Sequence, residues 1–375
     1  MRPLIHFIAS LLVTALWIHA KDSLIFISAF APGASAGIQS FAFNGKTGAL
    51  KPLHRTTDVQ NPFFLAISKN KQFLYAIDAK TFGDPGDEFV AAYSIEGRTG
   101  RLKRMNQQTS RGTASCYLDV DATGRTVVVA NYSSGSVAAF PTRADGSLGE
   151  IASFVQHSGS SVNPERQKGP NAHAIVISPD NRFALAADLG IDKILIYRLD
   201  AATAKLTPNE AQQFVKLQPG SGPRHLTFHP NGRHVYVINE LKNTVTLFDY
   251  TTASGLISER QTISTLPTDF AGKSHCADLK ITPDGRFLYG TNRGHDSLAV
   301  YRIADDGKLT LITIQPSLGQ GPQNLLITPD GQWLLCANMS GNRVIVFRID
   351  PASGEIKAVG DPVLMPMPSC LRWLN

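Results

Sequence analysis

Residues 278–294 read DLKITPDGRFLYGTNRG, and copies of this pattern recur along the whole chain. The clear copies are HAIVISPDNRFALAADLG (173–190), HLTFHPNGRHVYVINEL (225–241) and NLLITPDGQWLLCANMS (324–340). Two weaker copies come earlier, FLAISKNKQFLYAIDAK (64–80) and YLDVDATGRTVVVANYS (117–133). Each copy is an apolar stretch, a tight turn and a second apolar stretch, which predicts a pair of antiparallel strands.

The spacing inside the repeat is regular. When the third turn residue is taken as an anchor, successive anchors lie 46 to 57 residues apart. An Asp or Asn follows every anchor by seven residues, at Asp78, Asn131, Asp188, Asn239, Asn292 and Asn338. In five of the six copies an aromatic residue comes nine residues later and ends a third strand, and a fourth, weaker strand follows a glycine turn. Four antiparallel strands in about 50 residues are typical of a β-propeller blade.

The two ends of the chain supply one more blade. Residues 22–53 contain SLIFISAF, GIQSFAF and GALKPL, which match the second to fourth strands without a first strand. SCLRWLN at the C-terminus matches a first strand without followers. Joining the two closes the ring and leaves no open sheet edge. The sequence therefore predicts an all-β, seven-bladed propeller whose N- and C-terminal strands share one blade.

The first 20 residues, MRPLIHFIASLLVTALWIHA, have the pattern of a secretory signal peptide. A short basic start precedes an apolar run, and Ala20 offers a small residue for cleavage. We expect residues 21–375 to form the single propeller domain, exported to the periplasm or secreted. An uncleaved anchor or a buried N-terminal strand is the alternative for this segment.

Composition narrows the partners. Charged residues make up 18% of the chain, and the excess of basic residues gives a net charge of +6. No run of five or six like charges occurs, which argues against a nucleic-acid partner. No later apolar run is long enough to span a membrane. The mild positive charge favours an anionic small molecule. The four cysteines have no metal-binding spacing, and the sequence selects no disulfide pairing. Oligomeric state is not predicted.

Strand pairing places particular side chains at one mouth of the central channel. The start of each first strand pairs beside the end of the second strand, opposite the PDG-type turn, so polar residues at those positions should converge. They are Cys116, Tyr117, Asn131, His173, Asp188, Arg224, His225, Glu240, Asp278, Arg293, Gln323, Asn324 and Asn338. The loop at 157–171 adds His157, Arg166, Gln167 and Asn171. Such a gathering of charged and imidazole groups in a cavity predicts a site for a small molecule.

Three segments resemble the propeller-type lactonase family. They are GPRHLTFHPNGRHVYVINEL (222–241), NPERQKGPNAHAIVISPDNRFALAADLG (163–190) and ADLKITPDGRFLYGTNRGHDSLAVYRI (277–303). That family includes the bacterial seven-bladed 6-phosphogluconolactonases and is related to fungal carboxymuconate-lactonizing enzymes. The resemblance implies hydrolysis of a sugar lactone in the central cleft. It places His173, Asp188, Arg224, His225, Glu240 and Arg293 on motif positions. Asn171 stands where relatives often carry His, and Asp278 where many carry Glu.

Lactone hydrolysis needs a base for water, stabilisation of an oxyanion and orientation of the ring. Among the catalytic candidates, we expect Glu240 or His225 to activate water, with His173 next, and Arg224 to polarise the carbonyl. The choice between Glu and His stays open at this point, because it depends on burial. The expected substrate-binding residues are Arg293, Asp188, Asn131, Arg166, Gln167, Asp278 and Asn324.

Simpler interpretations compete with this one. The asparagines of the repeat register suit strand ends that bond the backbone, and Arg224 with Glu240 could be a structural ion pair. The whole ring could be an exported binding scaffold, or a muconate cycloisomerase. No cofactor and no metal are expected, although a divalent ion on Asp188, Glu240 or Asp278 remains an alternative.

Overall fold

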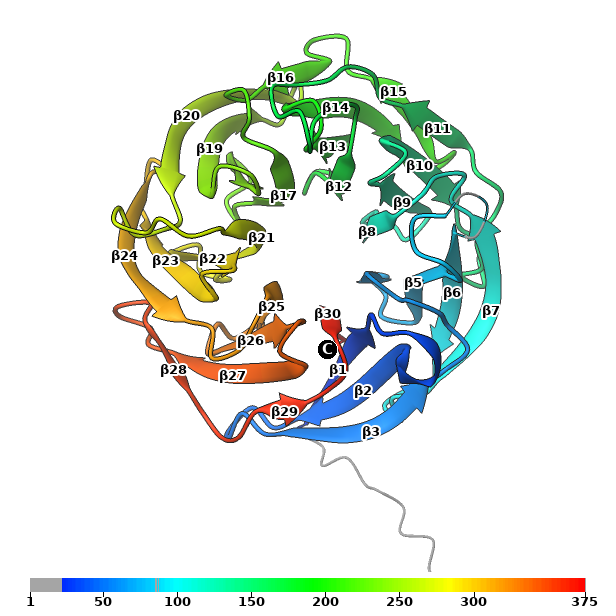
Figure 1. Cartoon of the computed structure of the whole chain (residues 1–375). Coiled ribbons are helices and arrows are strands. Elements are labelled where there is room, and N and C mark those ends of the chain that lie inside the picture. The colour runs from blue at the N-terminus through cyan, green and yellow to red at the C-terminus, as the bar shows by residue number, and fades with distance from the viewer. Residues whose placement is uncertain (1–21, 85, 87, 375) are drawn as a thin grey trace, which may run out of the picture.

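The computed structural model describes residues 22–84, 86 and 88–374 as seven antiparallel sheets arranged in a ring (Figure 1). The predicted seven-bladed, all-β propeller is confirmed. The predicted signal peptide at 1–20 lies outside the described residues. Within the described part of the chain, no helix is long and apolar enough to cross a membrane.

Three blades follow the first half of the chain, each written from its inner to its outer strand. The first has β4 (Leu65–Ile67), β5 (Phe73–Ala79), β6 (Glu88–Ile95) and β7 (Leu102–Thr109). The second has β8 (Ser115–Val120), β9 (Thr126–Asn131), β10 (Ser136–Pro141) and β11 (Ser153–Gln156). The third has β12 (Ala172–Ile177), β13 (Phe183–Asp188), β14 (Lys193–Asp200) and β15 (Lys205–Pro208), with β16 (Phe214–Lys216) also paired to β14.

Three more blades complete the repeat. The fourth has β17 (Pro223–Phe228), β18 (His234–Asn239), β19 (Thr244–Thr251) and β20 (Leu256–Ser264). The fifth has β21 (His275–Ile281), β22 (Phe287–Arg293), β23 (Ser297–Ile303) and β24 (Leu309–Pro316). The sixth has β25 (Pro322–Ile327), β26 (Trp333–Asn338), β27 (Arg343–Ile349) and β28 (Ile356–Ala358), with β29 (Val363–Leu364) also paired to β27.

The seventh blade joins the two ends of the chain. Its strands are β30 (Pro368–Trp373), β1 (Ser23–Ala29), β2 (Gly37–Phe43) and β3 (Leu50–Thr56), with a short 3-10 helix at Gly33–Ser35 between β1 and β2. Strand β30 pairs antiparallel with β1, with Ile27 opposite Leu371. The predicted closure is therefore confirmed, and every inner strand lies beside a second strand of its own blade.

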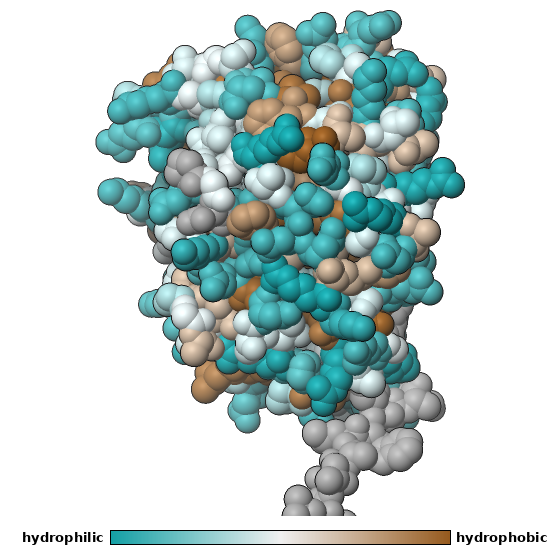
Figure 2. All heavy atoms as spheres, turned by 90° about the vertical axis from the view of Figure 1, so that its right-hand side faces the viewer, coloured by the Kyte–Doolittle hydropathy of each residue, from teal (hydrophilic) through white to brown (hydrophobic). Residues whose placement is uncertain are grey.

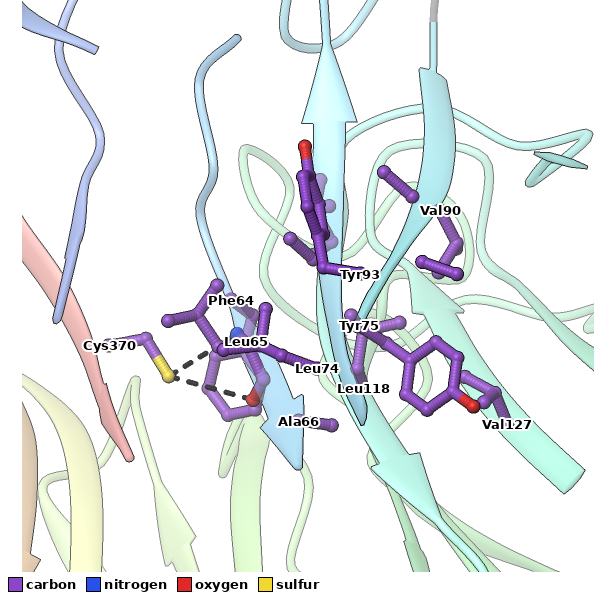
Figure 3. Packing of buried hydrophobic residues seen from close by; sticks show 14 of the residues in the cluster. Phe64, Leu65, Ala66, Leu74, Tyr75, Val90, Tyr93, Leu118, Val127 and Cys370 are labelled. Atoms are coloured by element: carbon purple, nitrogen blue, oxygen red, sulfur yellow. Dashed lines mark hydrogen bonds between the residues drawn. The ribbon is translucent and has the colours of Figure 1, made fainter. Parts of the chain in front are cut away.

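The cysteines pack in the core. All four are buried and unpaired, so no disulfide joins the blades. Cys370 of β30 lies at the junction with the first blade, where its Sγ accepts a hydrogen bond from Leu65 N at 3.4 Å (Figure 3). The sulfur also contacts Leu65 O at 3.8 Å, so the closing strand is bonded to the next blade as well as to its own.

Neighbouring blades are also clamped by buried tyrosines at the turn end. The hydroxyls of Tyr75, Tyr236 and Tyr289 each donate to the carbonyl oxygen of a turn glycine in the next blade, and Tyr289 bonds Gly354 O at 2.7 Å. Gly354 has a φ of +81°, and a Cβ there would lie 2.3 Å from the Phe287 ring. Only glycine combines this backbone conformation with so close an approach of the next blade.

Burial follows the distance of a strand from solvent. All six residues of β9, β13, β18 and β26 are buried, whereas β7, an outer strand, alternates between buried and exposed positions. The outer face of the ring is accordingly mostly hydrophilic (Figure 2). Stacked sheets bury both faces of their middle strands, which accounts for the low content of charged residues.

Candidate functional site

Irregular pairing at the start of the inner strands aims side chains into the channel. The register shifts between Ser115 and Tyr117 in β8, between Ala172 and Ala174 in β12, and between Pro223 and His225 in β17. The residues skipped by these bulges are Cys116, His173 and Arg224. A bulge breaks the alternation of side chains along a strand. It therefore lets Arg224 and His225, although adjacent in sequence, both be buried toward the channel.

Glu240 is the centre of the site. It follows β18, and its carboxylate meets three guanidinium groups from three parts of the chain. Arg166 Nη2 donates to Oε1 at 2.6 Å. Arg293 Nη2 donates to Oε2 at 2.8 Å, and Arg224 Nε lies 2.9 Å from the same oxygen. His173 Nε2 lies 3.9 Å from Oε2. The carboxylate thus has one oxygen with a single arginine and one with two.

These groups lie at different depths. The side chains of Arg166 and Arg293 are 33% and 25% exposed, whereas those of Glu240 and Arg224 are 6% and 1% exposed. Arg166 belongs to a loop, and its other bonded partner is the hydroxyl of Tyr132 at 3.0 Å. Three positive charges face one negative charge, so the site carries an excess of positive charge near solvent and favours an anionic ligand.

The surrounding charges fix the protonation of the carboxylate. Burial alone would raise the pKa of Glu240, but Arg293 and Arg224 hold that pKa well below its ordinary value. Burial lowers the pKa of the Arg224 guanidinium to about 10, with Arg293 adding to the effect. Both groups therefore remain charged at neutral pH.

His225 is bonded to a buried acid. Its Nδ1 lies 2.9 Å from Asp278 Oδ1, and its Nε2 lies 3.3 Å from Arg224 Nη1. Because a guanidinium can only donate, Nε2 is the acceptor and Nδ1 carries the proton that bonds Asp278. Burial, reinforced by Arg224, lowers the pKa of His225 to about 3. The imidazole is neutral, and its basic nitrogen is already occupied by Arg224.

Aromatic rings fill the channel beside these charges. The ring centroids of Phe64 and Tyr117 are 4.3 Å apart, those of Tyr117 and His225 5.0 Å, and those of His225 and His173 5.5 Å. His173 also packs edge-on against Tyr132 at 5.1 Å. Burial, with Arg224, lowers the pKa of His173 well below its ordinary value. Two neutral imidazoles thus form part of an apolar floor.

Several predicted substrate-binding residues have internal partners instead. Asn131 is buried and bonds Ser110 O, Ser115 Oγ and Ser136 Oγ. Gln167 is buried and donates to Leu189 O. Asp188 is buried and accepts bonds from backbone amides. Their contacts indicate a structural role, so the prediction that these three bind substrate is corrected.

Asp278 and Asn324 lie one layer behind the cleft. Asp278 Oδ2 accepts bonds from Asn324 Nδ2 at 2.7 Å and from Lys280 Nζ at 2.8 Å. Burial would raise the pKa of Asp278, but Lys280 and His225 hold it well below its ordinary value. Both residues hold His225 in place, which is an indirect position relative to a bound molecule.

Tyr132, Lys280 and the pairing of His157 with Asp188 were not predicted. A signal for Tyr132 exists in the repeat: it follows the register residue Asn131, as Glu240 follows Asn239 and Arg293 follows Asn292. Lys280 lies two residues after Asp278, on the same face of β21. The pairing of His157 with Asp188 has no local signal, because it joins residues of a loop and a strand end.

The described residues contain no group of three or more His, Cys, Asp or Glu side chains arranged to hold a metal ion. The acidic candidates of the sequence, Asp188, Glu240 and Asp278, each bond to donors of the protein instead.

Comparison with known proteins agrees with this geometry. A family described as "Lactonase, 7-bladed beta-propeller" matches residues 24–373. The chain is 34% identical over 351 residues to a 6-phosphogluconolactonase of Bacillus subtilis, covering 93% of this chain and 98% of that protein. A periplasmic gluconolactonase of Pseudomonas aeruginosa has a similar structure, with a TM-score of 0.88, 33% identity, and 94% and 99% of the two chains covered. A structure from Lactobacillus plantarum gives a TM-score of 0.87 at 29% identity, covering 94% and 100%.

Proposed function

Because this chain belongs to the seven-bladed β-propeller lactonase family, we propose that it hydrolyses a lactone in the cleft around Glu240. The observation that carries the proposal is the arrangement of Arg166, Arg224 and Arg293 on one buried carboxylate. A carboxylate can take a proton from water, and guanidinium groups can stabilise the negative charge that develops on a carbonyl oxygen.

Glu240 is the proposed general base, acting through Oε1. Oε2 stays with Arg224 and Arg293, both of which are also bonded to backbone carbonyls, of Ala277 and Cys276. Oε1 is held by Arg166 alone, and Arg166 comes from an exposed loop. An anionic group of the substrate competes for Arg166 and thereby frees Oε1. Loss of one positive contact raises the basicity of the carboxylate when the substrate is bound.

The reaction then proceeds by acyl transfer to water. Glu240 takes one proton as the water oxygen bonds to the lactone carbonyl carbon, and Arg224 and Arg293 face the resulting oxyanion. The ring C–O bond breaks as the tetrahedral intermediate collapses. The leaving alkoxide takes the proton back from Glu240, which gives the hydroxy acid and restores the carboxylate. No net electron transfer occurs, and water is the one co-reactant.

His225 and His173 are not proposed as the base. His225 has a pKa of about 3, and its Nε2 already accepts from Arg224. A group whose conjugate acid is so strong removes protons from water poorly. We assign His225 to hold Arg224 in place, and His173 to line the cleft beside Glu240.

The proposed substrate is a sugar lactone with an anionic substituent. The excess of positive charge and the partial exposure of Arg166 and Arg293 support this class. The named activities of the relatives, 6-phosphogluconolactonase and gluconolactonase, are consistent with it. A neutral sugar lactone, which lacks a group to compete for Arg166, should react less efficiently.

A pH-indicator assay on the purified protein tests the proposal. The panel comprises 6-phosphogluconolactone, gluconolactone and a carboxylated muconolactone, each against a matched blank, with and without EDTA. We expect the phosphorylated lactone to open fastest and EDTA to leave the rate unchanged. If no lactone opens faster than its blank, the proposed hydrolysis is wrong, and a binding scaffold remains.

Export is proposed on separate grounds. The signal pattern of residues 1–20 and the structural similarity to a periplasmic gluconolactonase support it. Intact-mass measurement of the protein recovered from its native host, after fractionation, should give a chain that begins near Lys21 outside the cytoplasm. Recovery of the full-length chain in the cytoplasm contradicts export.

A further inference from the structure

The loop at 157–171 carries Arg166, and one carboxylate holds both of its ends. His157 Nδ1 donates to Asp188 Oδ2 at 2.6 Å. Asn171 N donates to Asp188 Oδ1 at 2.7 Å, at the other end of the loop. The side chains of His157 and Asp188 are 0% exposed. Asp188 thus closes the base of the loop from within the protein, where water does not compete for the bonds.

Tyr197 extends this arrangement. Its hydroxyl lies 2.9 Å from His157 Nε2, and the two rings are nearly parallel. Since Nδ1 donates to the carboxylate, Nε2 is the acceptor and the Tyr197 hydroxyl is the donor. A continuous hydrogen-bond chain therefore runs from Tyr197 of β14 through His157 to Asp188 of β13, on the side of the loop base away from Glu240.

Bonds inside the loop connect its base to Arg166. Gln167 Nε2 donates to Leu189 O at 2.8 Å, immediately after Asp188. Gln167 Oε1 accepts from Asn163 N, and Asn163 Oδ1 accepts from Arg166 N at 3.0 Å. Ser161 Oγ is bonded to Asp192 Oδ2. The backbone of Arg166 is thereby held relative to β13 through side chains.

We propose that the Tyr197–His157–Asp188 chain is a positioning element that sets Arg166 against Glu240, and so determines how strongly the cleft takes an anionic substrate. None of these three residues touches the cleft carboxylate. Their effect acts through the loop. The structural part of the proposal stands by itself, whereas its catalytic part rests on the proposed function.

Native-state proteolysis tests the structural part. The loop contains trypsin sites after Arg166 and Lys168, and Lys168 is exposed. Tyr197→Phe removes one buried hydroxyl and keeps the ring. We expect cleavage at these two sites, identified by mass spectrometry, to become about tenfold faster, because the loss of a buried hydrogen bond favours local opening. His157→Gln should act in the same direction.

Tyr289→Phe is the matched control. It also removes a buried tyrosine hydroxyl, but one that bonds Gly354 O at the turn end of another blade. It should leave cleavage after Arg166 and Lys168 at the rate of the unmodified protein. Unchanged loop cleavage in Tyr197→Phe, or an equal acceleration in Tyr289→Phe, overturns the proposal.

A double-mutant cycle tests the catalytic part with 6-phosphogluconolactone. We expect Tyr197→Phe to raise KM several-fold with kcat within twofold, and to have no further effect on KM once Arg166→Met is present. Equal and additive effects of the two substitutions overturn the link to Arg166. If the unmodified protein hydrolyses no lactone, the proposed function fails, and the proteolysis comparison still decides whether the chain positions the loop.

Discussion

Arg224 Nε lies 2.9 Å from Glu240 Oε2, and the two side chains are 1% and 6% exposed. This contact is an ion pair without hydrogen-bond alignment, because Nε has no bonded acceptor. Arg224 is oriented elsewhere: its Nη1 donates to Ala277 O of the neighbouring blade. The guanidinium is thus fixed by the ring and not by its counter-ion, which keeps a positive charge in the cleft while Glu240 changes partners.

Glu240→Gln removes the proposed base and keeps its size. We expect kcat for the best lactone to fall between about 100-fold and 10,000-fold, the usual contribution of general base catalysis. Because the arginines lose their internal anion, inorganic phosphate should bind more tightly, as measured by competitive inhibition of residual activity or by calorimetry. Glu210→Gln, at an exposed position, serves as the control. An unchanged kcat in Glu240→Gln excludes this carboxylate as the base.

The arginines should separate into two kinds. Arg224→Met leaves a buried carboxylate with less compensation, so the free energy of unfolding should fall by about 3 kcal/mol. Arg166→Met affects a partly exposed pair and should cost less than about 1 kcal/mol. Urea denaturation measures both. Equal losses of stability contradict the difference in burial on which the roles of these two residues depend.

The pH dependence of hydrolysis should show Glu240 twice. In the free enzyme its pKa is held low by the arginines, so the acid limb of kcat/KM should lie below the ordinary range of a glutamate near pH 4. In the complex Arg166 has turned to the substrate, and the acid limb of kcat should lie at higher pH. Arg166→Met should move the limb of kcat/KM upward. Coincident limbs in the unmodified protein argue against the exchange of Arg166.

Stability should fall with acid because of a buried neutral histidine. His225 has a folded pKa of about 3, whereas an unfolded histidine takes a proton near pH 6.5. Below that pH the unfolded state binds the extra proton, so the free energy of unfolding falls as the pH decreases. Between pH 6.5 and 4.5 the loss from this residue should be about 2 kcal/mol.

The control for this effect is His225→Asn, which keeps a donor for Asp278 and does not titrate. Its stability should vary less over the same range, in urea denaturation at each pH. Below about pH 4 the carboxyls of Glu240 and Asp278, whose folded pKa values are lowered, add to the loss in both proteins. Parallel curves from pH 6.5 to 4.5 exclude His225 as a source of the acid sensitivity.

The thiols should be unreactive until the protein unfolds. All four cysteines are buried and free, and burial raises the pKa of Cys276 to about 12. Because the thiolate is the reactive form, a thiol reagent such as DTNB should label none of them in the folded protein. In urea it should label four per chain. Fewer than four in urea indicates a disulfide, which the packing of these residues does not contain.

The register of the repeat shows how far local patterns reach. Asn131, Asn292 and Asn338 were interpreted as strand-end residues, and each donates to the carbonyl oxygen of a residue just before the inner strand of its own blade. These bonds recur because the same residue occupies the same place in each blade. Glu240 and Arg293, directly after the register, were predicted at the mouth for the same reason and do meet there. Asp188 occupies the register too, yet it binds a loop that other blades lack.

The sequence by itself determined the seven blades, their four strands and the closure by the two termini, because strand periodicity and turn chemistry are local and repeat along the chain. Only the tertiary structure decided which charged residues share a carboxylate. The bulges that turn Cys116, His173 and Arg224 toward the channel break the alternation that local patterns assume. The choice of base likewise depended on burial and on charges from distant blades, which lower the pKa of Glu240 and His225 through space.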